Sequence, residues 1–160
     1  MERKYKINYY LDIADTVARR STCLRRQYGA IIVKSDEILS TGYNGAPRGR
    51  KNCHDLGRCY REELQIPSGE RYELCRSVHA EANAIISAAR RDILGGTLYL
   101  SGKMSPDGQY VPEICPCEMC KRLIINAGIV EIICKTGEDS HKVIKVRDWI
   151  WGDDSLPDME

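Results

Sequence analysis

The first part of the chain carries one helical and two extended patterns of hydrophobic residues. Over residues 7–18 the apolar side chains recur every three or four positions, which predicts an amphipathic helix. Two short apolar runs follow at 30–33 and 38–41, and the pair Ser35-Asp36 between them is typical of a turn. We therefore expect a helix followed by a β-hairpin.

The second half alternates between helical and extended patterns. A stretch rich in Ala and Ile at 79–91 predicts a helix, 97–100 predicts a strand, and 117–127 predicts a helix that ends before a glycine. The apolar run at 129–134 predicts a further strand, and we expect a last helix at 140–146. Strands that alternate with helices after an initial hairpin predict a three-layer α/β/α sandwich with a mixed sheet.

Two stretches show no regular pattern. The first, 44–78, is rich in glycine, cysteine and charged residues, with a short helix expected at 60–64. An irregular segment of that length is uncommon in a compact domain unless something holds it in place. The second stretch, 101–115, interrupts the passage from strand to helix. We expect a single domain over 1–152 and a loose acidic tail at 153–160.

Composition narrows the class of protein to a soluble globular domain. Of the 160 residues, 42% are hydrophobic and 29% are charged, which is enough apolar surface for one core. No run approaches the ~18 apolar residues that a membrane span needs. The charged N-terminus lacks the apolar stretch of a signal peptide. We therefore expect a cytoplasmic protein that has no membrane partner.

The charge balance argues against a nucleic acid as partner. The formal net charge is +1, so the surface as a whole offers no broad attraction for a long polyanion. Basic residues do gather at 19–20, 25–26 and 48–51. Two interpretations of these clusters stay open. They form a solvated face, or they line a pocket for a single phosphate group, which needs only one or two such side chains.

The eight cysteines indicate metal binding rather than disulfides. In a cytoplasmic protein thiols stay reduced, and cysteines grouped with histidine then indicate a metal site. The most specific group is His79 with Cys117 and Cys120. The two cysteines lie three residues apart behind Pro116, which suits the start of a helix, so both thiolates can reach one point in space. The positive end of that helix also stabilises thiolates.

This group has the composition of a catalytic metal site. Three protein ligands leave the fourth position of tetrahedral zinc open, whereas structural zinc is normally closed by four. Glu81 lies two residues after His79, at the expected junction between an irregular stretch and a helix, where its carboxylate can move protons. A lone Cys-x-x-Cys also occurs in zinc ribbons and redox pairs, so a purely structural zinc stays as the alternative.

A second group of cysteines lies upstream, at Cys23, Cys53, Cys59 and Cys75. Four thiolates suit a closed structural zinc, which would hold the irregular stretch in place because metal binding contributes folding free energy. His54 is the candidate to replace one of them. The alternative is that these cysteines are unlinked thiols. We expect two zinc ions per chain, one catalytic and one structural.

These motifs, taken in order, resemble the deoxycytidylate deaminase family within the cytidine deaminase-like superfamily. The resemblance spans about residues 21–134. It implies the cytidine deaminase-like fold and hydrolytic deamination of a cytosine nucleotide, with dCMP converted to dUMP and ammonia in the supply of dUMP for dTMP synthesis. It rests on the segments 20–23, 29–33, 41–45, 79–85, 116–120 and 127–129.

The resemblance also implies substrate contacts and an assembly. Asn44 would hydrogen-bond the sugar, and the backbone of Ala80 would contact the pyrimidine. A cationic side chain near Cys23 would hold the 5′-phosphate, and Arg26 is our candidate. Relatives are often hexamers that dCTP activates and dTTP inhibits, so we expect a homo-oligomer with a small-molecule nucleotide as substrate.

The sequence departs from the family in two places. The stretch 101–115 is inserted where relatives pass into Pro-Cys within a few residues, and Tyr28 replaces a small aliphatic residue. Because the insertion lies close to the metal ligands, the motifs support the chemistry more firmly than the substrate. Two alternatives follow: deamination of another cytosine compound or of an RNA base, and a non-catalytic zinc-stabilised binding module. Glu81 favours an enzyme, since a binding module does not need it.

Overall fold

The computed structural model describes residues 1–152, so the expected tail at 153–160 lies outside the described residues. Its centre is a mixed five-stranded sheet in the order β2-β1-β3-β4-β5. The β3–β4 pair is parallel, and the other neighbouring pairs are antiparallel. The strands are β1 (Arg26–Lys34), β2 (Glu37–Tyr43), β3 (Thr97–Met104), β4 (Glu131–Lys135) and β5 (His141–Lys145).

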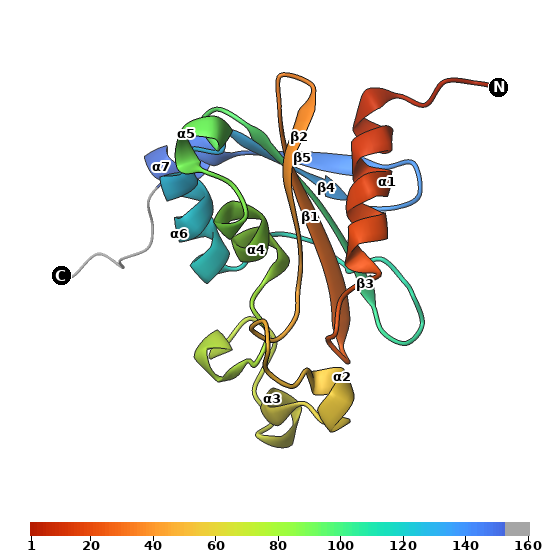
Figure 1. Cartoon of the computed structure of the whole chain (residues 1–160), viewed down its shortest axis with the longest axis vertical. Helices are drawn as coiled ribbons and strands as arrows, with labels where there is room; N and C mark the ends of the chain where they lie inside the picture. Colours follow the sequence, from red (N-terminus) through yellow and green to blue (C-terminus); the bar gives the residue numbers. More distant parts are fainter. Residues whose placement is uncertain (153–160) are drawn as a thin grey trace.

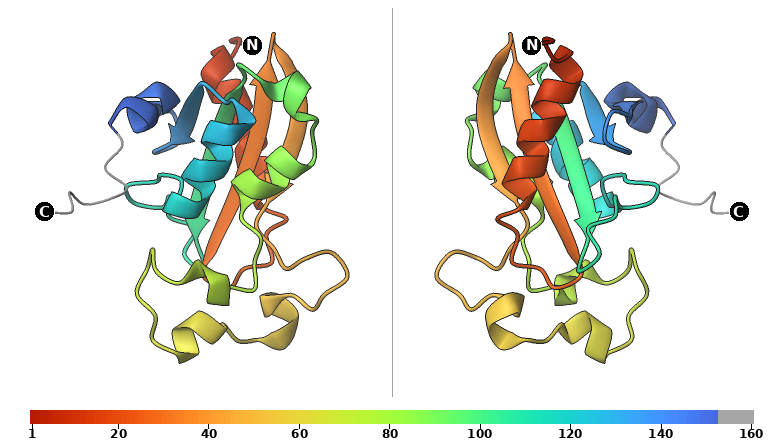
Figure 2. Two further views of the ribbon diagram at one scale, coloured as in Figure 1. Left: turned by 90° about the vertical axis from the view of Figure 1, so that its left-hand side faces the viewer. Right: turned by 90° about the vertical axis from the view of Figure 1, so that its right-hand side faces the viewer.

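Helices cover both faces of the sheet, which confirms the three-layer α/β/α sandwich (Figure 1). Helix α1 lies alone on one face, and Figure 2 shows α4, α5 and α6 together on the other. None of the helices within residues 1–152 is long and apolar enough to cross a membrane. The helices outside the irregular stretch 44–78 are α1 (Lys6–Ala18), α4 (Ala80–Ile86), α5 (Arg90–Ile93), α6 (Glu118–Ala127) and α7 (Val146–Trp151).

Strands β1, β3 and β4 are buried on both faces of the sheet, which explains why they read as continuous apolar runs. Successive residues of β1 point to opposite faces, so Ile31 belongs to the cluster that contains Leu11 of α1. Its neighbour Ile32 belongs to the cluster that contains Ile124 of α6. All four side chains are almost completely buried. Burial of each contributes about 1.5–3 kcal/mol, so the two helices are held on the sheet by apolar packing.

The expected helix at 140–146 is wrong. The chain forms β5 there and enters α7 only at Val146. Residues of β5 are alternately exposed and half-buried, which is the period of a strand, and the β-branched Val143 and Ile144 favour that conformation. Pairing with β4 makes β5 the last strand of the sheet.

Two other elements differ in extent from the sequence prediction. The expected helix at 79–91 is broken into α4 and α5, because Ala89 between them has an extended backbone, with φ −71° and ψ 135°. Strand β3 runs past 97–100 to Met104, so the first part of the 101–115 insertion is strand rather than irregular chain. The layers are unchanged by these shifts.

The irregular stretch forms a closed loop beyond one end of the sheet (Figure 1). Its ends meet where Gly45 and Val78 exchange backbone hydrogen bonds of 3.2 and 2.7 Å. We call residues 46–77 the cysteine-rich loop. Because the bonds at Val78 close the loop just before α4, they set the point at which His79 enters that helix. The loop contains α2 (Cys53–Leu56), α3 (Tyr60–Glu63) and a 3-10 turn at Tyr72–Leu74.

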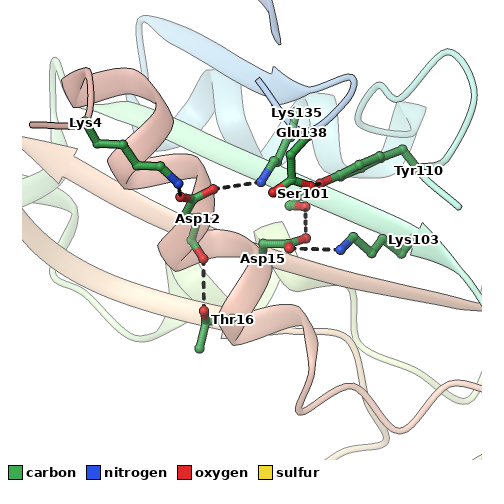
Figure 3. A network of polar contacts seen from close by, with 9 residues as sticks. All are labelled: Lys4, Asp12, Asp15, Thr16, Ser101, Lys103, Tyr110, Lys135 and Glu138. Carbon is green, nitrogen blue, oxygen red and sulfur yellow. Dashed lines mark hydrogen bonds and ion pairs between the residues drawn. The ribbon is translucent and has the colours of Figure 1, made fainter. Parts of the chain in front are cut away.

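A partly buried ion pair joins α1 to β4 on the α1 face of the sheet (Figure 3). The Lys135 side chain is 2% exposed, and its Nζ donates to Oδ1 of Asp12 at 2.8 Å. The same ammonium lies 5.6 Å from the ring centroid of Tyr110, in the insertion. Asp15, on the next turn of α1, pairs with Lys103 of β3 at 3.0 Å. The insertion is therefore tied to α1 through buried charge.

Asp12→Ala is expected to lower the free energy of unfolding by about 2–3 kcal/mol, because it leaves the Lys135 ammonium buried without its carboxylate. Lys135→Met is the matched control. It fills similar space and leaves Asp12 paired with Lys4, so it should cost less than about 1 kcal/mol. Urea unfolding curves with equal slopes measure both changes. An equal loss of unfolding free energy in the two variants would show that the contact is not stabilised by charge pairing.

Candidate metal centre and active site

Three side chains converge where the N-termini of α4 and α6 meet. His79 is the N-cap residue of α4, Cys117 is the N-cap residue of α6, and Cys120 lies in the first turn of α6. Nδ1 of His79 lies 3.5 Å from the Sγ atom of each cysteine. The three ligand atoms all lie within 4.8 Å of one another, and no other group of three such residues in the described part of the chain does so.

This geometry fits a zinc ion. Zinc bonds of about 2.1 Å to nitrogen and about 2.3 Å to sulfur, at tetrahedral angles, place nitrogen and sulfur ligands about 3.6 Å apart. The observed 3.5 Å separations match that value. Two thiolates and one imidazole are also a donor set that zinc prefers, and three ligands leave a coordination position for a reactant.

The electrostatics of the group favour a bound cation. The hydrogen bond from Cys120, followed by the contact with His79, lowers the pKa of the Cys117 thiol although burial opposes the change. Burial acts to lower the pKa of His79, but hydrogen bonds to the thiols of Cys117 and Cys75 raise it to about 10. The sulfurs thus attract positive charge, and a divalent cation held between them would supply it while the imidazole stays neutral.

Glu81 lies beside this group, as expected. It is 6% exposed, and burial raises the pKa of its carboxyl above the ordinary range. The Cys120 thiol donates a hydrogen bond to it. His79 has an extended backbone, with φ −70° and ψ 154°, and Glu81 is the second residue of α4. That change of backbone conformation lets both side chains line one cavity, although residues two apart in a helix point about 200° apart.

The cavity has a volume of about 750 Å³, and His79, Glu81 and Cys117 are among the residues that line it. Asn44 and Arg26 also line it. Ala80 is fully buried and is not among the lining residues. The cavity wall is basic, with arginine side chains at positions 25, 26, 50, 58, 61 and 76.

Asn44 is 6% exposed and fastens two segments of chain together. Its Oδ1 accepts a hydrogen bond from the backbone N–H of Tyr28 at 2.8 Å, and its Nδ2 donates to the carbonyl of Arg26 at 2.8 Å. These bonds occupy one of its two amide protons and one lone pair of its carbonyl oxygen. The remaining proton and lone pair are the groups that a ligand could use.

The two arginines at the start of β1 differ in their surroundings. Arg25 pairs with Glu62 at 3.0 Å, so its charge is already neutralised. Arg26 is in no ion pair within residues 1–152, and its guanidinium contacts the Tyr28 hydroxyl. Burial raises the pKa of Tyr28, and the Arg26 contact opposes that change. Of these two arginines, Arg26 is therefore the one whose charge remains available to an anionic ligand.

The second group of cysteines lines the same cavity. Cys23, Cys53, Cys59 and Cys75 all line it and are all free thiols. Burial, followed by repulsion from the other three thiols, raises the pKa of Cys53, which places the four sulfurs in one neighbourhood. No three of them lie within 4.8 Å of one another. His54 is exposed and does not line the cavity.

Two residues of this site are not predicted from the sequence. Tyr72 packs edge-on against the imidazole of His79, with ring centroids 4.8 Å apart. Arg61 is 5% exposed, and its guanidinium lies over the ring of that tyrosine. Neither residue lies in a motif, and the loop around them has no periodicity that would indicate burial.

Comparison with known proteins identifies the family. The family described as the cytidine and deoxycytidylate deaminase zinc-binding region matches residues 4–136. The chain belongs to this family. The matched range contains His79, Glu81, Cys117 and Cys120. The histidine and the two cysteines that converge therefore lie inside the family's zinc-binding region.

Individual relatives agree with this placement. The deoxycytidylate deaminase of Mycobacterium phage D29 is 36% identical over 129 residues, which cover 78% of this chain and 90% of the phage protein. That of Schizosaccharomyces pombe is 32% identical over 136 residues, 84% of this chain but 38% of the yeast protein. The chain thus spans about two fifths of that relative.

A solved structure shares the fold. The dCMP deaminase of cyanophage S-TIM5, in complex with dCMP and dUMP, superposes with a TM-score of 0.57 and 26% sequence identity. The match covers 83% of each chain. The mixed sheet with helices on both faces is therefore the fold of a cytidine deaminase-like protein.

Proposed function

We propose that the chain converts dCMP and water to dUMP and ammonia. The observation that carries the proposal is the placement of the buried Glu81 carboxyl beside the His79, Cys117 and Cys120 group, in one cavity with basic side chains. The three residues would hold the catalytic zinc, and Glu81 would move protons. Similarity to deoxycytidylate deaminases supports dCMP as the substrate.

The proposed chemistry uses Glu81 twice. Zinc, when bound, supplies the positive charge that lowers the pKa of a water molecule. The Glu81 carboxylate takes a proton from the water, whose oxygen forms a bond to C4 of the cytosine ring. Glu81 delivers that proton to the ring nitrogen N3. A second proton passes from the new C4 hydroxyl through Glu81 to the exocyclic nitrogen, the C4–N bond breaks as the C4 carbonyl forms, and ammonia leaves.

The substrate contacts are proposed on chemical grounds. Arg26 would bind the 5′-phosphate, because it lines the cavity and is in no ion pair within the described residues. Asn44 would use its remaining amide proton or lone pair on the sugar. The backbone of Ala80 would contact the pyrimidine. Ala80 follows His79 directly, although the residue is fully buried and its carbonyl lies close to Gly42 of β2.

A second, structural zinc is proposed for Cys23, Cys53, Cys59 and Cys75. Four thiolates are the donor set of a closed zinc site, and all four cysteines line the cavity. The cysteine-rich loop has few buried apolar side chains of its own, so a metal would account for its order. His54 is less suited than the cysteines, because it is exposed away from the cavity.

We also propose that the chain forms a homo-oligomer in the cytoplasm. Large apolar side chains are exposed on helices of the α6 face, including Met119 and Leu123 of α6 and Trp151 of α7. Exposed apolar groups gathered on one side of a domain mark interaction surfaces.

The substrate is tested by measuring ammonia release from dCMP, deoxycytidine, cytidine and a folded RNA. We expect dCMP to be the preferred compound. Arg26→Met should lower kcat/KM for dCMP about 10- to 100-fold, mainly through KM, because a charge-assisted hydrogen bond to phosphate is lost from ground and transition states alike. The rate with deoxycytidine, which has no phosphate, should not change.

Arg25→Met is the matched control, since that arginine already pairs with Glu62. It should leave the preference for dCMP intact. If deoxycytidine reacts as well as dCMP in the unmodified protein, the phosphate contact does not exist. If only the RNA reacts, the chemistry stands and the proposed substrate is wrong.

A further inference from the structure

An arginine is buried in the cysteine-rich loop, and no carboxylate of residues 1–152 pairs with it. Arg61 is 5% exposed, and its Nη2 donates to the carbonyls of Pro67 and Glu70 at 2.8 and 2.7 Å. Its buried Nε has no hydrogen-bond partner in the part of the chain that the structure describes. Burying a cation costs free energy unless other groups compensate the charge, so a contact at this position must offset that cost.

The face of an aromatic ring provides part of the compensation. The guanidinium carbon of Arg61 lies 4.5 Å from the ring centroid of Tyr72, within the range of a cation–π interaction. Tyr72 in turn meets the imidazole of His79 in an edge-to-face arrangement, with centroids 4.8 Å apart and planes at 84°. The three side chains therefore form a stack of successive contacts, from Arg61 to Tyr72 to His79, and the last of them belongs to the metal centre.

His79 depends on such contacts for its orientation. As the N-cap residue of α4 it has extended backbone, and its side chain forms no capping hydrogen bond with the helix. The preceding residues 75–78 are in neither helix nor strand. Its imidazole must therefore be oriented by side chains from elsewhere in the fold, and Tyr72 is the ring that packs against it.

We propose that Tyr72 and Arg61 are positioning residues for His79. Tyr72 fixes the plane of the imidazole so that Nδ1 faces Cys117 and Cys120, and Arg61 fixes Tyr72 by holding its ring and the 67–70 segment together. The inference rests on the proposed function only in that His79 binds the catalytic zinc.

The backbone adds a second link through the same turn. The N–H of Cys75 donates to the carbonyl of Tyr72 at 2.9 Å, and the Cys75 thiol is hydrogen-bonded to the His79 imidazole. The 3-10 turn at Tyr72–Leu74 thus places both an aromatic ring and a thiol against one metal ligand. Partners that orient a metal-ligating histidine typically change metal affinity 10- to 100-fold when removed.

The test is the rate at which zinc leaves the full-length, zinc-loaded protein for a chromogenic chelator. The phase that belongs to the catalytic site is the one missing in Cys120→Ser. We expect Tyr72→Leu to accelerate this phase about 10- to 100-fold. Tyr72→Phe keeps the ring and should stay within about threefold of the unmodified protein, while Arg61→Met should fall between them. Tyr60→Leu changes an exposed tyrosine of the same loop and is the matched control.

Melting temperatures measured on the same samples separate positioning from simple support of the loop. If Tyr72→Leu melts earlier but releases catalytic zinc at the unmodified rate, the proposal is wrong. Tyr72→Met fills the space without a ring and replaces the Leu variant if the latter does not fold. If the unmodified protein shows no phase that depends on Cys120, the metal centre itself is refuted. That result can be told apart from failure of the positioning proposal, in which the Cys120-dependent phase is present and Tyr72→Leu does not change its rate.

Discussion

Glu81→Gln is expected to slow ammonia release at least about 10²-fold while zinc stays bound, because the amide cannot accept and return a proton. The change preserves side-chain size and leaves His79, Cys117 and Cys120 in place. Glu81 is 6% exposed and accepts a hydrogen bond from the Cys120 thiol, so only a substitution of the same shape tests its proton transfer without disturbing the packing. The loss should appear in kcat, since the proton transfers occur on the way to the transition state.

Zinc content and the circular dichroism spectrum of this variant should match those of the unmodified protein. Glu118→Gln is the matched control: this acid lies at the first position of α6, but its side chain is 83% exposed and turned to Lys121. It should keep full activity. His79→Ala should give the opposite pattern, with loss of catalytic zinc as well as activity. Near-normal turnover by Glu81→Gln would remove Glu81 from the mechanism.

The layers of the fold could be predicted because long periodic segments carry them. The helical period before residue 18 and the continuous apolar runs of β1, β3 and β4 reflect burial that extends over many residues. The short edge strand β5 could not be predicted in this way. Only one face of it is partly covered, and its strand conformation depends on pairing with β4.

The metal centre could be predicted because its geometry is mostly local. Pro116 and the three-residue spacing place Cys117 and Cys120 in one helical turn, and the irregular stretch before α4 places His79 at a helix start. The stack of Arg61 and Tyr72 on His79 depends instead on how the cysteine-rich loop folds back on itself. No local spacing records that packing, so the sequence contains no sign of it.

The proposed structural zinc lies between these cases. The sequence predicts Cys23, Cys53, Cys59 and Cys75 as its ligands. The structure gathers them around one cavity, but no three of their sulfurs lie within 4.8 Å of one another. The cysteines are separated by 6 to 30 positions along the chain. No single turn of the chain can fix their geometry, so their spacing alone does not predict how the four sulfurs are arranged.

Cys53→Ser is expected to reduce the zinc content from about two ions to about one per chain, measured by elemental analysis after purification without chelator. Cys53 is the most buried of the four thiols and begins α2, so its loss should open the closed site. Structural zinc contributes about 10–16 kcal/mol to the folding of small zinc-dependent domains. The cysteine-rich loop should therefore lose protection against hydrogen exchange and proteolysis, while the sheet keeps it.

Cys115→Ser is the matched control for this change. Cys115 is an exposed thiol two residues before Cys117, outside both proposed ligand sets, so the variant should retain two zinc ions and a protected loop. The catalytic zinc of Cys53→Ser should be released faster than normal, because the loop that carries Tyr72 and Cys75 no longer holds His79. One zinc ion per chain in both the unmodified protein and Cys53→Ser, with an equally protected loop, would show that the four cysteines are unlinked thiols.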